Sequence, residues 1–352
     1  MTARLTFRPL VQIGAGVSAD DSMLAGGPLR FHQIEAVVRD ETRECARAVI
    51  AVARAVAWAE AFGLAAVAKD LVQRLSAPRP PFAGLDLGRP QIMGVINVTP
   101  DSFSDGGDRF DPARAITDGL AMREAGAAIL DVGGESTRPG AAPVPPEEEV
   151  RRVVPVVAGL VKAGALVSID TRRAAVMAAA LDAGAKIIND VTALAGDPEN
   201  LALAAERQAP VILMHMQGEP RTMQHDPHYD DAPLDVYDFL AARVAACEAA
   251  GIPRARIAID PGIGFGKTMA HNLRILDQLA VFHGLGCAMV LGLSRKSFIG
   301  RLGGGGDAKA RLPGSLAGAL AGAARGVHIL RVHDVAETVQ ALAVWSAIEG
   351  GG

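Results

Sequence analysis

The chain has 352 residues, of which 50% are apolar, and a formal net charge of −4. This length suits one large domain or two ordinary ones, and the weak negative charge excludes a nucleic-acid-binding protein, which would carry a basic surplus. Charges interrupt the long apolar runs, so no membrane span is expected. Three cysteines (Cys45, Cys247, Cys287) lack paired or metal-ligand spacing and the N-terminus lacks a signal-peptide layout, which indicates reduced thiols in a cytoplasmic protein.

Residues 1–75 differ from the rest of the chain and are expected to form a mostly helical extension of unassigned function. Residues 5–14 are compatible with a strand. Residues 40–62 place polar side chains on one face and Ala and Val on the other, which predicts a helix ending at Gly63, and 64–75 predict a second helix. Residues 76–90 are rich in proline and glycine, as is typical of a linker.

From residue 91 to 352, strand-like and helical segments alternate. The predicted strands are 91–97, 128–132, 165–170, 186–190, 210–215, 256–260, 287–293 and 326–332. The predicted helices are 112–125, 147–162, 172–183, 198–205, 232–250, 272–282, 313–324 and 335–348. Most strands are continuous apolar runs, which indicates a parallel sheet buried on both faces. Eight such units in close to the ~250 residues of a typical (β/α)8 barrel favour that α/β fold over an open doubly wound sheet.

The predicted strands end in polar or charged residues. These ends are Asn97, Asp131, Asp170, Asn189 with Asp190, His215, Asp260, 294–297, and Arg331 with His333. One strand that ends in aspartate is ordinary, because aspartate caps helices, but eight such ends are hard to attribute to capping. In a barrel they meet at one mouth, which is where barrel enzymes carry their chemistry.

This mouth has the groups to bind a flat heterocycle, a diphosphate and an acid. The carboxylates of Asp170 and Asp260 can each accept two parallel N–H bonds from a planar ring. Arg331 can hold a phosphate or diphosphate. Asn97 is a hard oxygen donor that could bind Mg2+ together with that diphosphate. Ser297 is predicted to start a helix, whose N-terminus could receive a carboxylate.

Eight segments carry a resemblance to a known family. In chain order they are INVTPDSFSDGG (96–107), GGESTRPG (133–140), SIDT (168–171), IIND (187–190), MHMQG (214–218), DPGIGFGK (260–267), SRKS (294–297) and RVHD (331–334). Together they resemble the dihydropteroate synthases, over about residues 91–352. Any one of them alone would be a weak signal, whereas eight in order are highly specific.

The resemblance implies a transferase of folate biosynthesis. Such an enzyme condenses 6-hydroxymethyl-7,8-dihydropterin diphosphate with 4-aminobenzoate and yields 7,8-dihydropteroate and pyrophosphate. Pyrophosphate leaves first, a resonance-stabilised pterin cation forms, and the amine attacks it. The resemblance also implies Mg2+ as cofactor and a homodimer.

The resemblance assigns site residues by their motifs. The catalytic residues are Asp105, Asp170, Arg331 and His333. The pterin diphosphate is bound by Thr137, Asp170, Asn189, Asp260, Lys296, Arg331, Val332 and His333. The 4-aminobenzoate is bound by Phe103, Thr137, Arg138, Phe265 and Ser297. The metal is bound by Asn97.

Other interpretations remain open at this stage. A methyltetrahydrofolate-using methyltransferase also binds a pterin, but it needs no diphosphate site. A barrel that binds pterin without turnover could dispense with Asp105 or with the diphosphate cations. Lys296 could form a Schiff base in an aldolase-like barrel, and His215 is more often a buried core residue than a ligand. The family pattern also departs at Arg172 and Arg173, where a short polar residue and then a lysine are expected, and it leaves residues 1–85 unexplained.

Overall fold

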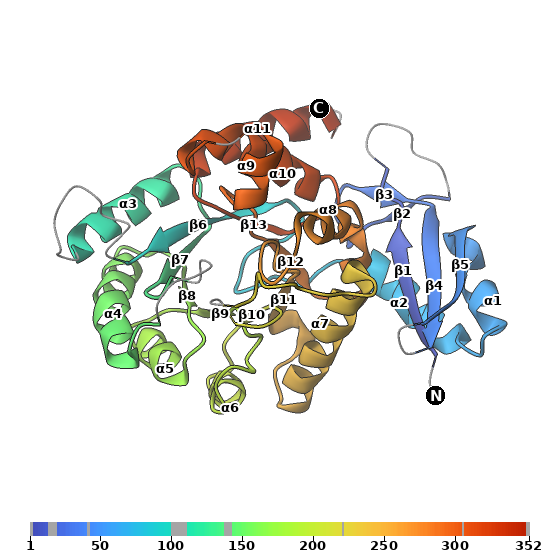
Figure 1. Cartoon of the computed structure of the whole chain (residues 1–352), viewed down its shortest axis with the longest axis horizontal. Helices are drawn as coiled ribbons and strands as arrows, with labels where there is room; N and C mark the ends of the chain where they lie inside the picture. Colours follow the sequence, from blue (N-terminus) through green and yellow to red (C-terminus); the bar gives the residue numbers. More distant parts are fainter. Residues whose placement is uncertain are drawn as a thin grey trace.

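The computed structural model describes residues 3–12, 20–40, 43–99, 111–136, 143–219, 222–304 and 306–349. These residues form a closed barrel of eight parallel strands and, beside it, a smaller unit built on a three-stranded antiparallel sheet (Figure 1). None of the helices in these ranges is long and apolar enough to cross a membrane.

All eight predicted barrel strands are confirmed. They are β6 (Gln91–Asn97), β7 (Ile129–Gly133), β8 (Val167–Asp170), β9 (Ile187–Asp190), β10 (Val211–Met214), β11 (Ile257–Asp260), β12 (Ala288–Leu291) and β13 (Ile329–Val332). The last strand, β13, pairs in parallel with the first, β6, with Arg331 opposite Met93. This pairing closes the sheet, so the barrel is confirmed and the open doubly wound sheet was the wrong alternative.

Helices surround the barrel between successive strands. They are α3 (Pro112–Glu124), α4 (Pro146–Lys162), α5 (Ala174–Asp182), α6 (Asn200–Glu206), α7 (Ala232–Ala249), α8 (Met269–Asp277), α9 (Ser297–Leu302), α10 (Leu312–Ala323) and α11 (Val335–Glu349). Short 3-10 helices are η3 (Arg254–Arg256), η4 (Leu279–Leu285) and η5 (Lys309–Arg311). The eight predicted helices are present, and α9 begins at Ser297, where the sequence predicts a helix start. The 3-10 turns are too short for the periodicity of the sequence to show.

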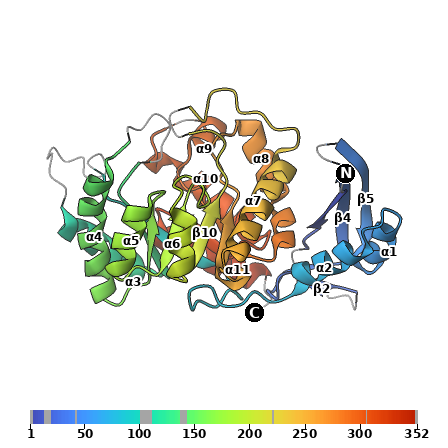
Figure 2. The ribbon, with the colours of Figure 1, turned by 90° about the horizontal axis from the view of Figure 1, so that it is seen from below.

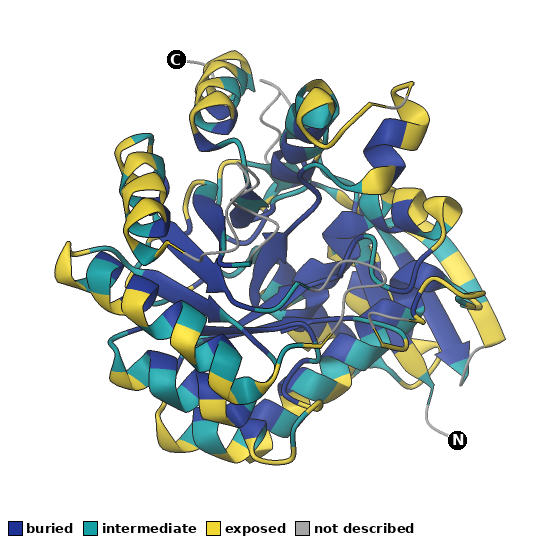
Figure 3. Ribbon diagram, turned by 60° about the vertical axis from the view of Figure 1, so that its left-hand side comes forward, coloured by how far each residue is buried: buried dark blue, intermediate teal, exposed yellow. Residues whose placement is uncertain are grey.

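The barrel strands are buried along nearly their whole length, as Figure 3 shows. Their side chains face two different apolar layers in alternation. Alternate residues point outward into the layer between sheet and helices, as Leu130 and Val132 of β7 do. The residues between them point into the barrel. Near the start of the strands the inward residues form one apolar layer: Met93, Ile129, Ile187, Ile212, Ala258, Ala288, Val290 and Ile329. Most inward positions nearer the strand ends are polar, among them Asp131, Asp170, Asn189, Asp260 and Arg331, so the chemistry is concentrated at one end of the barrel.

The prediction of a mostly helical extension was wrong. Its core is the antiparallel sheet of β1 (Arg4–Pro9), β4 (Gln33–Asp40) and β5 (Arg43–Ala51), with the small hairpin β2 (Ser22–Met23) and β3 (Arg30–Phe31). Helices follow as η1 (Val52–Arg54), α1 (Ala55–Glu60) and α2 (Ala65–Ser76). The strand predicted within 5–14 is confirmed in its first half, and the helix predicted at 64–75 is α2.

Strand β5 replaces most of the helix predicted at 40–62. Its exposure alternates, with Arg47 and Val49 exposed and Ala48 and Ile50 half-buried. Its Glu, Arg and Ala residues fit a helix, but the β-branched pair at 49–50 also fits a strand. Pairing with β4 decides between the two, because it places Ile50 opposite Ile34 over the core of the extension.

The segment predicted as a linker closes the floor of the barrel. Residues 77–90 run from α2 to β6 along the lower side of the barrel in Figure 2. Phe82 is fully buried and Leu87 is nearly so, and both pack against the inward apolar layer. Buried Arg79 donates to four carbonyl oxygens: those of Arg74, Ala77, His283 and Cys287, at 2.8–3.1 Å. The segment is therefore part of the barrel core.

We expect Phe82→Ala to lower the free energy of unfolding by about 3–5 kcal/mol, the usual cost of removing a buried phenylalanine ring. Urea unfolding followed by circular dichroism measures this loss. Because Phe82 lies at the end of the barrel opposite the mouth, KM for both substrates should stay unchanged in the folded variant. A loss below about 1 kcal/mol would mean that the floor does not depend on this ring.

Candidate active site

One arginine links three strands at the barrel mouth. Arg331, on β13, donates from Nε to Oδ2 of Asp131 on β7 and from Nη2 to Oδ2 of Asp170 on β8, each at 2.6 Å. Asn189, on β9, donates from Nδ2 to the same Oδ2 of Asp131 at 3.0 Å. All four residues occupy inward positions of the strands. The guanidinium therefore holds two carboxylates side by side, where they would otherwise repel each other.

The other half of the mouth is built around Asp260 and Lys296. Asp260 ends β11, and its Oδ1 accepts from the backbone N–H of Gly262 at 2.7 Å. Lys296 precedes α9, donates to the carbonyl oxygen of Ile263, and has its Nζ 4.6 Å from the centre of the Phe265 ring. The loop 261–268 thus contacts both a carboxylate and an ammonium group, and its aromatic ring lies beside the ammonium group.

Burial changes the pKa values of the ionisable groups at this mouth. It raises the pKa of Asp170, with Arg331 opposing the shift and Asp131 adding to it. It also raises the pKa of Asp260, against the pull of Lys296. Burial lowers the pKa of Lys296 to about 8, while Asp260 opposes that shift. Perturbed carboxyl and amine groups that share one cavity are typical of a functional site.

Comparisons with known proteins identify the family. Residues 93–333 match the family model described as "Pterin binding enzyme". The dihydropteroate synthase of Escherichia coli K12 is 48% identical over 264 residues, which cover 75% of this chain and 93% of that protein. The chain belongs to the dihydropteroate synthases.

Solved structures agree in fold. A Xanthomonas albilineans dihydropteroate synthase with 4-aminobenzoic acid is 50% identical, with a TM-score of 0.72, over 77% of this chain and 98% of that chain. The same enzyme in complex with 7,8-dihydropteroate is 47% identical, with a TM-score of 0.70 and the same shares covered. The relatives thus correspond to the barrel, and the N-terminal extension lies outside the family model.

The structure brings most of the predicted pterin residues together. Asp170, Asn189, Asp260, Lys296 and Arg331 all lie at the mouth, through the contacts described above. Four predicted residues fall outside the described part of the chain: Phe103, Asp105, Thr137 and Arg138.

Other predicted residues of the dihydropteroate synthase site lie at its rim. Phe265 is half-buried beside Lys296, and Ser297 is exposed as the first residue of α9. His333 follows β13 and pairs through Nδ1 with Oγ of Ser294 at 3.1 Å. Val332 is different, because its side chain is buried in the outer apolar layer of the barrel. Its predicted contact with the diphosphate can therefore come only from its main chain, as expected for an outward position of a strand.

Asn97 is the residue that the sequence predicts as the Mg2+ ligand. It is half-buried at the end of β6, beside Gly133 of β7, and its amide makes no side-chain hydrogen bond to another described residue. Within the described ranges no cluster of three or more His, Cys, Asp or Glu could hold a metal ion. A single protein oxygen suits Mg2+, which keeps several waters and takes its remaining ligands from substrate phosphates.

Asp131 has no assigned role in the sequence prediction, although it ends a strand. It is fully buried, and its Oδ2 orients both Arg331 and Asn189. The available signal was alternation: Ile129 of the same strand points inward, so residue 131 must do so too. By the same alternation, Asp190, the neighbour of Asn189, points outward. There it accepts a hydrogen bond from Asn200 of α6 at 3.0 Å.

The two departures from the family pattern form a cluster of their own. Arg172 donates from Nε to Oε2 of Glu135 at 3.1 Å, and Arg173 donates from Nη2 to Oε1 of Glu135 at 3.0 Å. The backbone N–H of Val144 also donates to Glu135, at 3.0 Å. These arginines therefore neutralise Glu135, and Nε of Arg173 also lies 3.4 Å from Oε2 of Glu149.

Proposed function

We propose that this chain makes 7,8-dihydropteroate from 6-hydroxymethyl-7,8-dihydropterin diphosphate and 4-aminobenzoate. The observation that carries the proposal is the mouth itself, in which N–H acceptors (Asp170, Asn189, Asp260) and a phosphate-binding guanidinium (Arg331) meet at one barrel end. The chain belongs to the dihydropteroate synthases, and the substrates proposed here are those of that family. A binding barrel without turnover would have no need to keep a half-buried arginine between two carboxylates.

The role of each residue follows from the charge that develops on the substrates during the reaction. The carboxylates of Asp260 and Asp170 accept N–H groups of the pterin, and Lys296 donates to its acceptor edge. The C–O bond to the diphosphate breaks with its electron pair on the leaving oxygen, and Arg331 and His333 stabilise that charge. The amine of 4-aminobenzoate then forms the C–N bond and releases a proton to solvent. By resemblance, Asp105 and Asp170 face the pterin cation.

Asn97 would hold Mg2+ together with the diphosphate oxygens. The ion would supply charge neutralisation to the leaving group, as divalent cations do in phosphate chemistry. Asn97 itself orients the diphosphate relative to Arg331 across the mouth. The assignment rests on the chemistry of a single carboxamide at the end of β6, with no carboxylate cluster beside it among the described residues.

A pyrophosphate-release assay tests the function. Purified full-length protein with Mg2+ should release pyrophosphate only when pterin diphosphate and 4-aminobenzoate are both present. Release without 4-aminobenzoate would indicate a hydrolase. Binding of the pterin without any release would indicate the non-catalytic barrel, and methyl transfer from methyltetrahydrofolate would indicate the methyltransferase.

We expect kcat/KM for the pterin diphosphate to fall on both sides of a pH optimum. The Lys296 ammonium loses its proton as pH rises through its pKa of about 8, so its charged contact is lost on the alkaline side. Asp170 and Asp260 have raised pKa values, so as pH falls they take up protons and lose their acceptor charge. Lys296→Arg should move the alkaline limb upward, because a guanidinium stays charged. An alkaline limb that is unchanged in Lys296→Arg would assign it to another group.

We further propose a cytoplasmic homodimer. All three cysteines are free thiols, as a reducing compartment requires.

Helix α11 exposes two large apolar side chains, Val344 at 57% and Ile348 at 71%, and such patches commonly mark a protein interface. Sedimentation velocity should give twice the mass of one chain, and Val344→Glu should shift it toward the monomer. A monomeric wild-type protein would contradict the proposal.

A further inference from the structure

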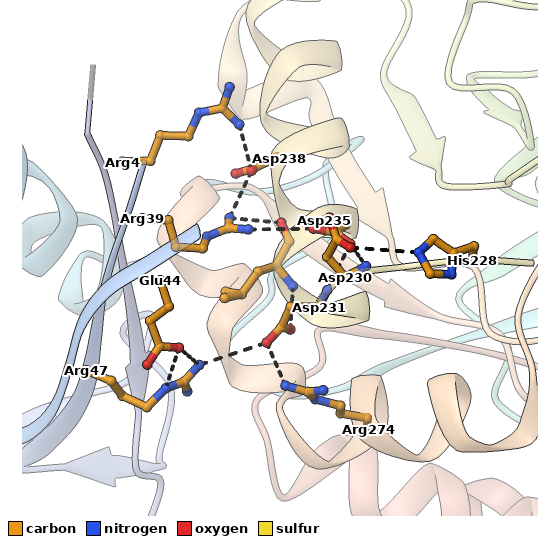
Figure 4. Close-up of polar contacts among 11 residues, drawn as sticks. Arg4, Arg39, Glu44, Arg47, His228, Asp230, Asp231, Asp235, Asp238 and Arg274 are labelled. Atoms are coloured by element: carbon orange, nitrogen blue, oxygen red, sulfur yellow. Dashed lines mark hydrogen bonds and ion pairs between the residues drawn. The ribbon is translucent and has the colours of Figure 1, made fainter. Parts of the chain in front are cut away.

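The N-terminal extension contacts the barrel through a charged interface at the start of α7. Three arginines of the extension face three aspartates of the barrel across this interface (Figure 4). The arginines are Arg4, Arg39 and Arg47, and the aspartates are Asp231, Asp235 and Asp238. The family model begins at residue 93, so this interface has no counterpart within it.

Arg39 is the buried member of this interface. Its side chain is only 3% exposed, and its Nη2 donates to Oδ2 of Asp238 at 2.9 Å while Nη1 lies 3.6 Å from Oδ1 of Asp235. Arg4 binds the same Oδ2 of Asp238 at 2.7 Å, but its side chain is 56% exposed. A buried charge depends on its partners far more than an exposed one does. Arg39 therefore ties the extension to α7, and Arg4 adds little.

The partner of Arg39 also holds the loop before α7. Oδ2 of Asp235 accepts from the backbone N–H groups of Asp230 and Asp231, at 2.9 and 3.0 Å. Burial raises the pKa of Asp235, whereas these N–H groups and Arg39 lower it. Arg39, from the extension, is thus one of the groups that favour the ionised form of Asp235. This ionised carboxylate fixes the last residues of the loop that leads from β10 to α7.

That loop in turn holds the loop that carries Phe265. Tyr229 donates from its hydroxyl to the carbonyl oxygen of Gly266 at 2.7 Å, and Gln224 donates to the carbonyl oxygen of Gly264 at 2.6 Å. The two loops are in close contact, because a Cβ at Gly266 would lie 2.3 Å from the carbonyl oxygen of Gln217. The carbonyl groups on both sides of Phe265 therefore accept bonds from this loop, and Tyr229 directly precedes the two residues that Asp235 of α7 holds.

We propose that the extension positions the 4-aminobenzoate site, with Arg39 as its positioning residue acting through Asp235, Tyr229 and Gly266 on Phe265. The proposal rests on the proposed function, because Phe265 is the ring that 4-aminobenzoate contacts there. It gives residues 1–76 a role that the resemblance leaves open. Asp260 has its own anchor at Gly262, so pterin binding should depend much less on the extension.

Steady-state kinetics of full-length variants test the proposal. Arg39→Met should raise KM for 4-aminobenzoate about three- to tenfold, in the range expected for contacts within one network. KM for pterin diphosphate and kcat should stay within about twofold. Tyr229→Phe, which removes the bond to Gly266, should reproduce the same selective rise. Arg4→Met is the matched control, because it removes the exposed bond to the same Asp238 oxygen and should change neither KM.

The double variant distinguishes an effect that passes from Arg39 through Tyr229 from a general loss of stability. If Arg39 acts through Tyr229, Arg39→Met with Tyr229→Phe should raise KM little more than either single change. Should Arg39→Met fold poorly, Arg39→Lys keeps the positive charge but cannot bridge both carboxylates, and an intermediate KM is expected. Equal effects on both substrates, multiplied effects in the double variant, or a lowered melting temperature with both KM values unchanged would overturn the proposal. Wild-type pyrophosphate release tests the function independently of all these variants.

Discussion

Arg331→Met should lower kcat/KM by about 10²–10³-fold, the usual cost of losing a group that stabilises transition-state charge. The change removes the cation that meets the departing diphosphate. It also removes the positive charge that opposes the raised pKa of Asp170, so Asp170 should take up a proton more readily and its acceptor role should weaken. Arg331→Lys keeps the charge but loses one of the two directed bonds, and should recover only part of the activity.

Stopped-flow or steady-state pyrophosphate release measures this loss, and urea unfolding separates it from a folding defect. Arg243→Met is a suitable control. Arg243 is also half-buried, but it donates to the carbonyl oxygens of Ala193 and Leu194, on the helical side of the barrel. That variant should lose stability and keep its kinetics. If Arg331→Met retained more than a tenth of wild-type kcat/KM, the diphosphate role would be wrong.

Asp260→Asn should weaken binding of the pterin diphosphate by roughly 10–100-fold. Asp260 is 5% exposed, and the N–H of Gly262 already occupies its Oδ1. The other oxygen remains for the N–H edge of the pterin, and an amide there would lose the charge that strengthens such a bond or turn a donor toward a donor. Hydrogen bonds to buried charges contribute about 1.5–3 kcal/mol, which corresponds to roughly 10–100-fold in affinity.

Isothermal calorimetry with pterin diphosphate measures the change directly. Asp190→Asn is the matched control, because Asp190 is fully buried one residue after a predicted pterin ligand, yet its oxygens accept from Thr192, Leu194 and Asn200. It should lower the melting temperature and leave pterin affinity unchanged. Equal losses in the two variants would mean that Asp260 supports the fold rather than the ligand.

The barrel could be predicted from local patterns because a parallel strand buried on both faces needs a continuous apolar run. Such runs leave little choice of strand position, as β6 at 91–97 shows with its predicted bounds confirmed. The site followed from topology, because a barrel brings the C-terminal ends of all its strands to one face. The sequence therefore predicts that Asp170, Asp260 and Arg331 lie at one mouth of the barrel.

Contacts between segments distant in sequence could not be predicted in this way. The residues of β5 are compatible with either a helix or a strand, and only pairing with β4 selects the strand. The proline-rich segment at 77–90 has the composition of a linker, yet Phe82 fills the barrel floor because the closed barrel leaves an apolar opening there. Asp131 and Arg39 have no motif of their own, because each gains its role from partners far along the chain: Arg331 and Asn189 for the first, and α7 for the second.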